Sequence, residues 1–412
     1  MLRRKTLLSK YAELAVKIGA NVQKGQPLMI SANIETKDFI RILVEEGYKA
    51  GASHVFVRYN DEIANHHTYT YCDLEHLGTV PNYIVEQFNY FIEKGYALIS
   101  VHAETPGLMA DIDPIKIQTA AIAQNKALKH WREHTMGNRT QWCVISVPTV
   151  GWAKKVFPDI TEEMAVDALW EAIFNAVRVR EDNDPVAEWE KHNETLHKHN
   201  KALNDFNFKS LHFKNALGTD LTIELVLNHV WAGGNEKSTK GVVFNPNMPT
   251  EESFTMPYKF GVNGKVVATK PLNYNGNLIK DFWLEFKDGK VVNYDAKEAK
   301  DSLKSLVEFD EGSSYLGEVA LISHDSPISN SNILFLNTLF DENASCHLAL
   351  GRAYPMNVKG GNDMTQEELD KLGSNNSMEH EDFMFGSADM SIIGLTQDNQ
   401  EVIVFKDGNF AF

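Results

Sequence analysis

Cysteine is scarce in this chain of 412 residues. The three cysteines, Cys72, Cys143 and Cys346, lie far apart in the sequence, and no two of them form a Cys-x-x-Cys pair. This spacing excludes a disulfide framework and argues against a zinc site built from thiolates. Because unpaired thiols are typical of reducing compartments, the cysteine content predicts a cytoplasmic protein.

Long apolar runs and an excess of basic charge are also missing. No segment reaches the roughly 18 apolar residues of a transmembrane helix, and we expect no signal peptide. The formal net charge is −16. Because nucleic acids and anionic membranes attract basic surfaces, this charge argues against both as partners. The hydrophobic fraction of 43% is that of a globular protein with a large core, long enough for two or three domains.

Several common catalytic and nucleotide-binding motifs are absent. The first predicted strand is not followed by Gly-x-Gly-x-x-Gly, and the glycines at 233 and 234 lack the spacer of a P-loop. No His-Glu-x-x-His occurs, which excludes that single-zinc helix motif. A Ser/His/Asp triad stays open, although the Gly-x-Ser-x-Gly turn that often carries its nucleophile is missing.

The first half of the chain alternates between helical and strand patterns. Near-continuous apolar runs predict strands at 28–32, 54–59, 96–101 and 142–147. Helical spacing predicts helices at 7–18, 39–44, 81–91 and 111–132, and another that starts at Thr161, its N-terminal cap. This alternation predicts an α/β domain with a mostly parallel sheet and helices on its faces.

From about residue 205 the pattern becomes rich in strands. Strands are predicted at 221–227, 265–269, 281–286, 291–294, 315–323, 390–394 and 401–405. Turn signals occur at 263–264, 288–289 and 407–408. The sequence therefore predicts two domains, an α/β domain at 1–204 and a β-rich α+β domain at 205–412. The polar segment 184–204 between them is interpreted as a solvated helix.

The best candidate for a metal site lies near the C-terminus. His380 and Asp382 are two residues apart, and in an extended segment residues i and i+2 point to the same side. Glu379 and Glu381 add negative charge beside them. Because such crowding is unfavourable without a cation, the segment is a candidate for binding a divalent metal.

Three further positions could complete the site. Glu251 and Glu252 follow Pro-Thr in a turn, although the same four residues are also an ordinary helix start. Glu318 lies in a strongly apolar strand, where a carboxylate is costly unless it is paired or bound to metal. His347 precedes an apolar run and could equally be a core histidine, as Tyr354 could be a packing residue. Together, glutamate, histidine and aspartate suit a pair of divalent ions.

The order of these segments resembles the M29 metallo-aminopeptidases, the group of thermophilic aminopeptidases and aminopeptidase S. The resemblance is carried by Asn-x-Pro-Thr-Glu-Glu-x-Phe-Thr-x-Pro at 247–257, Ala-Thr-Lys-Pro-Leu at 268–272, Gly-Glu-Val-Ala-Leu at 317–321, Cys-His-Leu-Ala-Leu-Gly-x-Ala-Tyr at 346–354 and Asn-Ser-x-x-His-x-Asp-Phe-Met at 376–384. It extends along essentially the whole chain.

The resemblance implies roles for individual residues. The family's metal ligands correspond to Glu252, Glu318, His347, His380 and Asp382, with Glu318 as the bridge. Tyr354 corresponds to the catalytic tyrosine. Adjacent acids allow the assignment of Glu252 to slip by one, and Glu251 is then left as a candidate general base.

The resemblance also implies an activity. It predicts that two divalent ions, Zn, Co, Mn or Mg, assist removal of the N-terminal residue from short peptides with a free N-terminus. It further implies a homodimer with active sites facing an enclosed cavity. Two alternatives stay open: another dinuclear metal amidohydrolase, and a non-catalytic peptide-binding protein.

Overall fold

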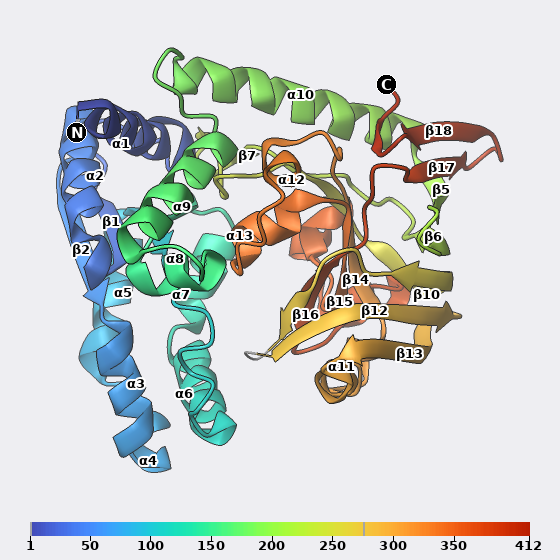
Figure 1. The fold of residues 1–412 in the computed structure, drawn as a ribbon, viewed down its shortest axis with the longest axis horizontal. Coiled ribbons are helices and arrows are strands. Elements are labelled where there is room, and N and C mark those ends of the chain that lie inside the picture. Colours follow the sequence, from blue (N-terminus) through green and yellow to red (C-terminus); the bar gives the residue numbers. More distant parts are fainter. Residues whose placement is uncertain (1, 275–276) are drawn as a thin grey trace. The chain divides into compact units, whose positions relative to one another are not determined.

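The computed structural model describes residues 2–274 and 277–412, and the chain divides into two compact units. The first consists of Met1–Lys191 and Asn235–Pro249, and the second of His192–Gly234 and Thr250–Phe412. The predicted fold class is confirmed, because one unit has a parallel sheet and the other is rich in antiparallel strands (Figure 1). The domain boundary predicted after residue 204 concerns independent folding and stays a prediction.

The first unit is built on a parallel sheet. Its strands have the order β2-β1-β3-β4, with bounds β1 (Leu28–Asn33), β2 (Val55–Asn60), β3 (Ala97–His102) and β4 (Trp142–Ser146). All three pairings are parallel. These are the strands predicted from the apolar runs. In β1 and β3 consecutive residues are buried on both faces, as such runs require, whereas the edge strand β2 is only partly buried.

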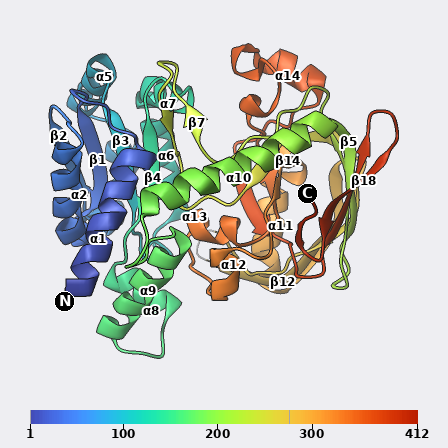
Figure 2. The ribbon, with the colours of Figure 1, turned by 90° about the horizontal axis from the view of Figure 1, so that it is seen from above.

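Helices surround this sheet (Figure 2). Their bounds are α1 (Leu2–Leu14), α2 (Lys37–Lys49), α3 (Glu62–Tyr71), α4 (Leu74–Leu77), α5 (Asn82–Lys94), α6 (Pro114–Ala127), α7 (Lys129–Met136), α8 (Val150–Val156) and α9 (Glu162–Ala176). Met29 and Leu98 pack with Phe88 and Phe91 of α5 in one buried cluster. The predicted cap of α9 is present, since the Thr161 hydroxyl accepts a hydrogen bond from the backbone of Met164.

The single helix predicted over 111–132 is wrong in detail, because two helices meet there. Asp113 caps α6 and Pro114 is its first residue. At Leu128 the backbone leaves helical geometry, with φ −101° and ψ 20°. Leu128 is also buried in the cluster around Phe88, which a straight helix would not guarantee. Tertiary burial of one side chain therefore overrides local helical propensity.

The second unit contains a large sheet, mostly antiparallel in its pairings. Its strand order is β11-β12-β10-β6-β5-β17-β18-β19, with β13 paired to β12. The bounds are β5 (Phe208–Lys214), β6 (Asp220–Leu225), β10 (Pro257–Val267), β11 (Leu272–Tyr274), β12 (Asn277–Lys287), β13 (Lys290–Glu298), β17 (Ser391–Thr396), β18 (Glu401–Lys406) and β19 (Asn409–Phe410). The same unit contains helices α11 (Lys300–Val307) and α14 (Gln366–Leu372).

One turn signal was misleading. Asn263 and Gly264 lie inside β10, where Gly264 pairs with Leu221 of β6. Gly264 has φ +118°, and a Cβ atom there would meet the Asp220 carbonyl oxygen at 2.2 Å. The glycine thus permits close approach of two strands rather than a hairpin turn. The signals at 288–289 and 407–408 do mark turns, between β12 and β13 and between β18 and β19.

A smaller antiparallel sheet in the second unit has the order β16-β15-β14-β9 (Figure 1). Its strands are β9 (Ser253–Thr255), β14 (Leu316–Leu321), β15 (His347–Gly351) and β16 (His380–Met384). Every residue of β14 and β15 is buried. Side chains on these strands are therefore held in place by a buried, closely packed part of the sheet.

The polar helix predicted at 184–204 is α10 (Pro185–Phe206). Its interpretation as a solvated helix is wrong for one face, because Trp189, Leu196 and Leu203 are buried. Among the described residues, no helix is both long enough and apolar enough to cross a membrane.

Candidate metal centre

The register of the small sheet aligns the predicted ligands on one face. Ala349 of β15 pairs with Glu318 of β14 on one side and with Asp382 of β16 on the other. His347 and His380 also share this face, because alternate residues of a strand point the same way. Four predicted ligands thus come from three adjacent strands, and Ala349 is the small residue that leaves room between the two carboxylates.

Glu318 reaches this position through an irregularity in its strand. The pairing of β14 with β15 shifts register between Leu316 and Glu318. At Gly317 a Cβ atom would lie 2.3 Å from the Arg352 carbonyl oxygen and 2.4 Å from that of Gly351. Only glycine allows the backbones to approach so closely, which sets the direction in which Glu318 leaves the strand.

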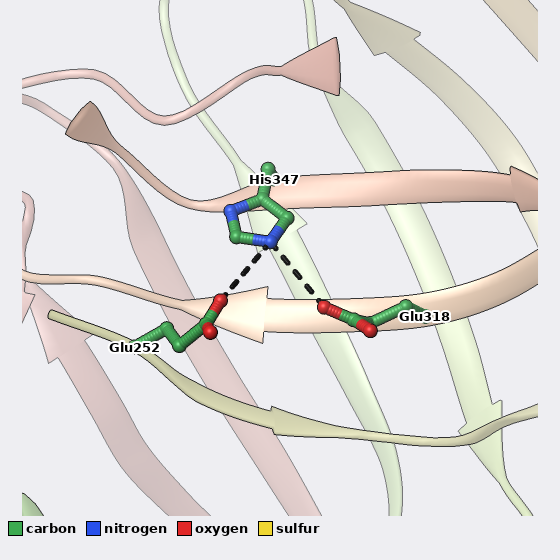
Figure 3. A group of neighbouring side chains, drawn as sticks. All are labelled: Glu252, Glu318 and His347. Carbon is green, nitrogen blue, oxygen red and sulfur yellow. Dashed lines mark hydrogen bonds and ion pairs between the residues drawn. The ribbon is translucent and has the colours of Figure 1, made fainter. Parts of the chain in front are cut away.

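The imidazole of His347 faces two glutamates (Figure 3). Its Nε2 lies 3.4 Å from Glu252 Oε2 and 3.3 Å from Glu318 Oε1. Glu252 precedes β9, the neighbour of β14 in the sheet. The ligand atoms of these three buried side chains lie within 4.8 Å of one another, close enough to share one ion.

A second imidazole faces the same pair of carboxylates. His380 Nε2 lies 3.8 Å from Glu318 Oε2 and 3.7 Å from Asp382 Oδ2, while Asp382 Oδ1 lies 3.8 Å from His347 Nε2. Glu318 and Asp382 thus each present one oxygen to His347 and the other to His380. His380 Nδ1 is 2.7 Å from the Arg352 carbonyl oxygen, a contact that orients the ring and leaves Nε2 as the ligand atom.

Burial strongly affects the electrostatics of this cluster. Burial and the nearby charges of Glu318 and Asp382 raise the pKa of Glu252 to about 8, against the opposing effect of His347. Burial disfavours the His347 imidazolium, but the carboxylates of Glu318, Asp382 and Glu252 outweigh it and raise its pKa to about 10. The cluster therefore holds protons where a cation could stand.

The donor set fits divalent metal ions. Within the described residues, Asp382 Oδ1 is a buried oxygen with no hydrogen-bond partner, as expected of an atom reserved for a cation. Carboxylate oxygens and imidazole nitrogens suit Zn, Co and Mn, and the carboxylates also suit Mg. Glu252 faces His347, whereas Glu318 and Asp382 face both imidazoles.

The two remaining predicted residues lie nearby. The Tyr354 ring packs against His380, with ring centroids 4.6 Å apart. Burial and then the charge of Glu318 raise the pKa of Tyr354, so its hydroxyl keeps its proton. The buried Glu251 carboxylate lies 3.7 Å from His192 Nε2 on α10. Of the two adjacent acids, Glu252 is the one whose carboxylate contacts His347. The catalytic roles of Glu251 and Tyr354 stay predictions.

Sequence reasoning missed Glu342. Its pKa is raised well above its ordinary value by burial and then by the charges of Glu252 and Asp382, which places it within electrostatic reach of the cluster. Glu342, Glu381 and Asp382 also line one cavity of about 60 Å³. Burial and the charge of Asp382 raise the pKa of Glu381 to about 8. The only signal in the sequence was an acid five residues before His347.

Comparison with known proteins finds relatives that match along nearly the whole chain. The family model of thermophilic metalloproteases (M29) matches residues 4–410. The chain is 48% identical to aminopeptidase 2 of Geobacillus stearothermophilus and 46% identical to aminopeptidase AmpS of Bacillus subtilis (strain 168). Each alignment spans 405 residues and covers 98% of both chains.

The fold is also similar to that of a solved relative. Wild-type AmpT from Thermus thermophilus superposes with a TM-score of 0.92 at 38% sequence identity. The match covers 99% of this chain and 100% of the other. Both units are therefore part of the shared fold.

We predict that metal binding at neutral pH releases protons. Metal ligands must be deprotonated, and without metal the pKa values of Glu252 and His347 are about 8 and 10. Both groups therefore hold protons at pH 7 that the metal displaces, so apparent affinity should rise between pH 6 and pH 8. Calorimetric titration of Co²⁺ into metal-stripped protein, in buffers of different ionisation enthalpy, counts these protons. Glu252→Gln should release fewer, and heats independent of the buffer would contradict the prediction.

Proposed function

The chain belongs to the M29 family of thermophilic metalloproteases, and on that premise we propose that it is a metal-dependent aminopeptidase acting on short peptides. The observation that carries the proposal is the division of the oxygens of Glu318 and Asp382 between His347 and His380. Two carboxylates arranged in this way suit a two-metal site. The names of the relatives, which are aminopeptidases, support the reaction.

Two divalent ions bound at these residues would supply Lewis acidity and a water of lowered pKa. Glu252, Glu318, His347, His380 and Asp382 hold them in the proposal. Because Glu318 and Asp382 lie on paired strands, their carboxylates would be held in place for the ions before substrate arrives.

Tyr354 is proposed to stabilise the developing negative charge on the scissile carbonyl. Its hydroxyl stays protonated in the buried, anionic surroundings and can therefore donate a hydrogen bond to that oxygen. Donors of this kind are typically worth about 3 kcal/mol in the transition state. The ring contact with His380 fixes the tyrosine beside the cluster.

A carboxylate must take the proton of the attacking water and pass it to the leaving amine. We propose Glu251 for this role, as the sequence predicts. Glu342 is the second candidate, because its charge is coupled to those of Glu252 and Asp382. Asn343 joins the two candidates: its side-chain oxygen accepts from the Glu251 backbone at 2.8 Å, and its nitrogen is 3.4 Å from Glu342 Oε1.

The acidic cavity beside the cluster accounts for exopeptidase action in this proposal. Glu342 and Glu381 line it together with Asp382. A free α-amino group is a cation at neutral pH, so it would be held by these carboxylates, and a blocked N-terminus would not. The proposal includes a homodimer, which the family resemblance implies, and a cytoplasmic location, which the cysteine content predicts.

Release of free amino acids from short peptides tests this function. Metal-stripped protein would receive Zn, Co, Mn or Mg, with N-acetylated copies of every peptide alongside. We expect cleavage of the free-amine peptides alone, and only after metal is restored. Cleavage of acetylated peptides would instead indicate another metal amidohydrolase, and no cleavage with any metal would favour a peptide-binding protein.

Replacing Glu318 should remove the metal. We expect Glu318→Gln to lose metal loading and activity, because one of the two carboxylates that face both imidazoles becomes a neutral amide. Metal content after dialysis, measured by atomic emission, checks this. Glu285→Gln, which changes an exposed glutamate of β12, is the matched control and should keep both. Full metal content and activity in Glu318→Gln would refute its role.

Replacing each candidate base by glutamine distinguishes the roles of Glu251 and Glu342. We expect Glu251→Gln to lower kcat by about 10²–10⁴ while the metal content is kept, since that is the usual contribution of a general base. Glu342→Gln should have the smaller effect on kcat. Steady-state rates with a chromogenic amino-acid anilide measure both. A larger decrease in kcat for Glu342→Gln than for Glu251→Gln would instead assign the general base to Glu342.

A further inference from the structure

A row of polar side chains crosses the parallel sheet of the first unit. Ser31 of β1 pairs in register with Arg58 of β2 and with Ser100 of β3. Residues paired in this way share one face of a sheet. The neighbouring row on that face is apolar, with Met29 paired to Leu98. Three half-buried polar side chains at one level of adjacent strands thus interrupt the apolar face of this sheet.

This row lines a cavity of about 240 Å³. Met29, Leu98, Phe88 and Leu128 form apolar walls, and Trp131 of α7 adds an aromatic surface. The guanidinium of Arg58 lies over the Phe88 ring, 5.4 Å from its centroid, which limits the directions it can take. The exposed Arg132 of α7 lines the same cavity.

The polar groups of the cavity are available to a ligand. Neither Arg58 nor Arg132 forms an ion pair with any other described residue, and the hydroxyls of Ser31 and Ser100 have no hydrogen-bond partner among them. Two cations and two hydroxyl donors therefore surround an apolar space without a carboxylate to neutralise them. This is the donor set of an anion site.

The position of this cavity in the fold also supports an anion site. The strand order β2-β1-β3-β4 changes direction between β1 and β3, which are the strands that carry Ser31 and Ser100. In open parallel sheets, ligands bind at the carboxyl ends of the strands where the order reverses. Ser31, Arg58 and Ser100 are each the fourth of six residues in their strands, so the polar row lies toward this end, and Met29 and Leu98 extend the cavity over the face of the sheet.

We propose that this cavity binds a small organic carboxylate with an apolar or aromatic body. The carboxylate would pair with Arg58 and Arg132 and accept hydrogen bonds from the serine hydroxyls. The body would lie against Met29 and Trp131. Since every residue involved belongs to the first unit, the site is separate from the metal centre in the second.

Phenylacetate is a suitable probe, because its neutral counterpart phenylacetamide has nearly the same shape. Calorimetry on the full chain should show phenylacetate binding at least about tenfold more tightly than phenylacetamide or inorganic phosphate. Arg58→Gln should weaken phenylacetate binding about tenfold or more, since it removes a charge-assisted hydrogen bond. Arg41→Gln removes an exposed arginine of α2 with the same change in net charge and should leave the affinity unchanged.

Arg132→Gln provides a second variant. Because Arg132 is exposed, we expect this substitution to leave the fold intact. It should also weaken phenylacetate binding, so the test stands even if Arg58→Gln does not fold. Equal binding of phenylacetamide, phosphate binding without phenylacetate binding, or no binding at all would overturn the proposal. So would phenylacetate binding that neither arginine variant weakens, which is the result expected if the carboxylate binds only at the metal centre.

Discussion

Mutual repulsion between buried carboxylates is the constraint on which the second unit depends. Glu252 and Glu318 are buried and Asp382 is nearly so, and all three converge on His347. Without a cation, the cluster reduces its charge by holding protons, as the raised pKa of Glu252 indicates. A divalent cation bound here would remove both the repulsion and the protons, which would couple metal binding to the local stability of this sheet.

The small sheet holds these carboxylates at fixed positions and leaves space between them for a cation. Glu318, His347 and Asp382 occupy paired strands whose backbone hydrogen bonds set their spacing. Gly317 lets two strands approach closely, and Ala349 keeps the centre of the row open. A site on strands is held more precisely than one on loops, which suits side chains that must converge on a metal ion.

Local pattern predicted part of this site, and strand register supplied the rest. The spacing of His380 and Asp382 was informative because a single extended segment determines it, and β16 provides that segment. The contact of Glu252 with His347 depends on the pairing of β9 with β14 and of β14 with β15, which no local pattern specifies. Here the resemblance to a family supplied the ligand assignment that strand register could not give from sequence alone. Glu342 had no such help and was overlooked.

The same distinction explains the errors in the fold. Asn263 and Gly264 have turn chemistry, yet pairing of β10 with β6 keeps them in a strand. Leu128 has good helical propensity, yet its helix ends there and the side chain is buried. In each case a nonlocal contact outweighs a local preference of about 1 kcal/mol or less.

Register also gives meaning to polar residues that sequence reading assigned simply to buried strands. Ser31, Arg58 and Ser100 interrupt three separate apolar runs, and only their alignment across β2, β1 and β3 shows that the interruptions form one surface. Glu318 and Asp382 are aligned in the same way across β14, β15 and β16. The two rows differ in the sign of their charge. The row on β14, β15 and β16 presents carboxylates, whereas the row on β2, β1 and β3 presents a guanidinium and hydroxyl donors. Since an unpaired guanidinium attracts an anion and crowded carboxylates attract a cation, the row on β2, β1 and β3 favours anions and the row on β14, β15 and β16 favours cations.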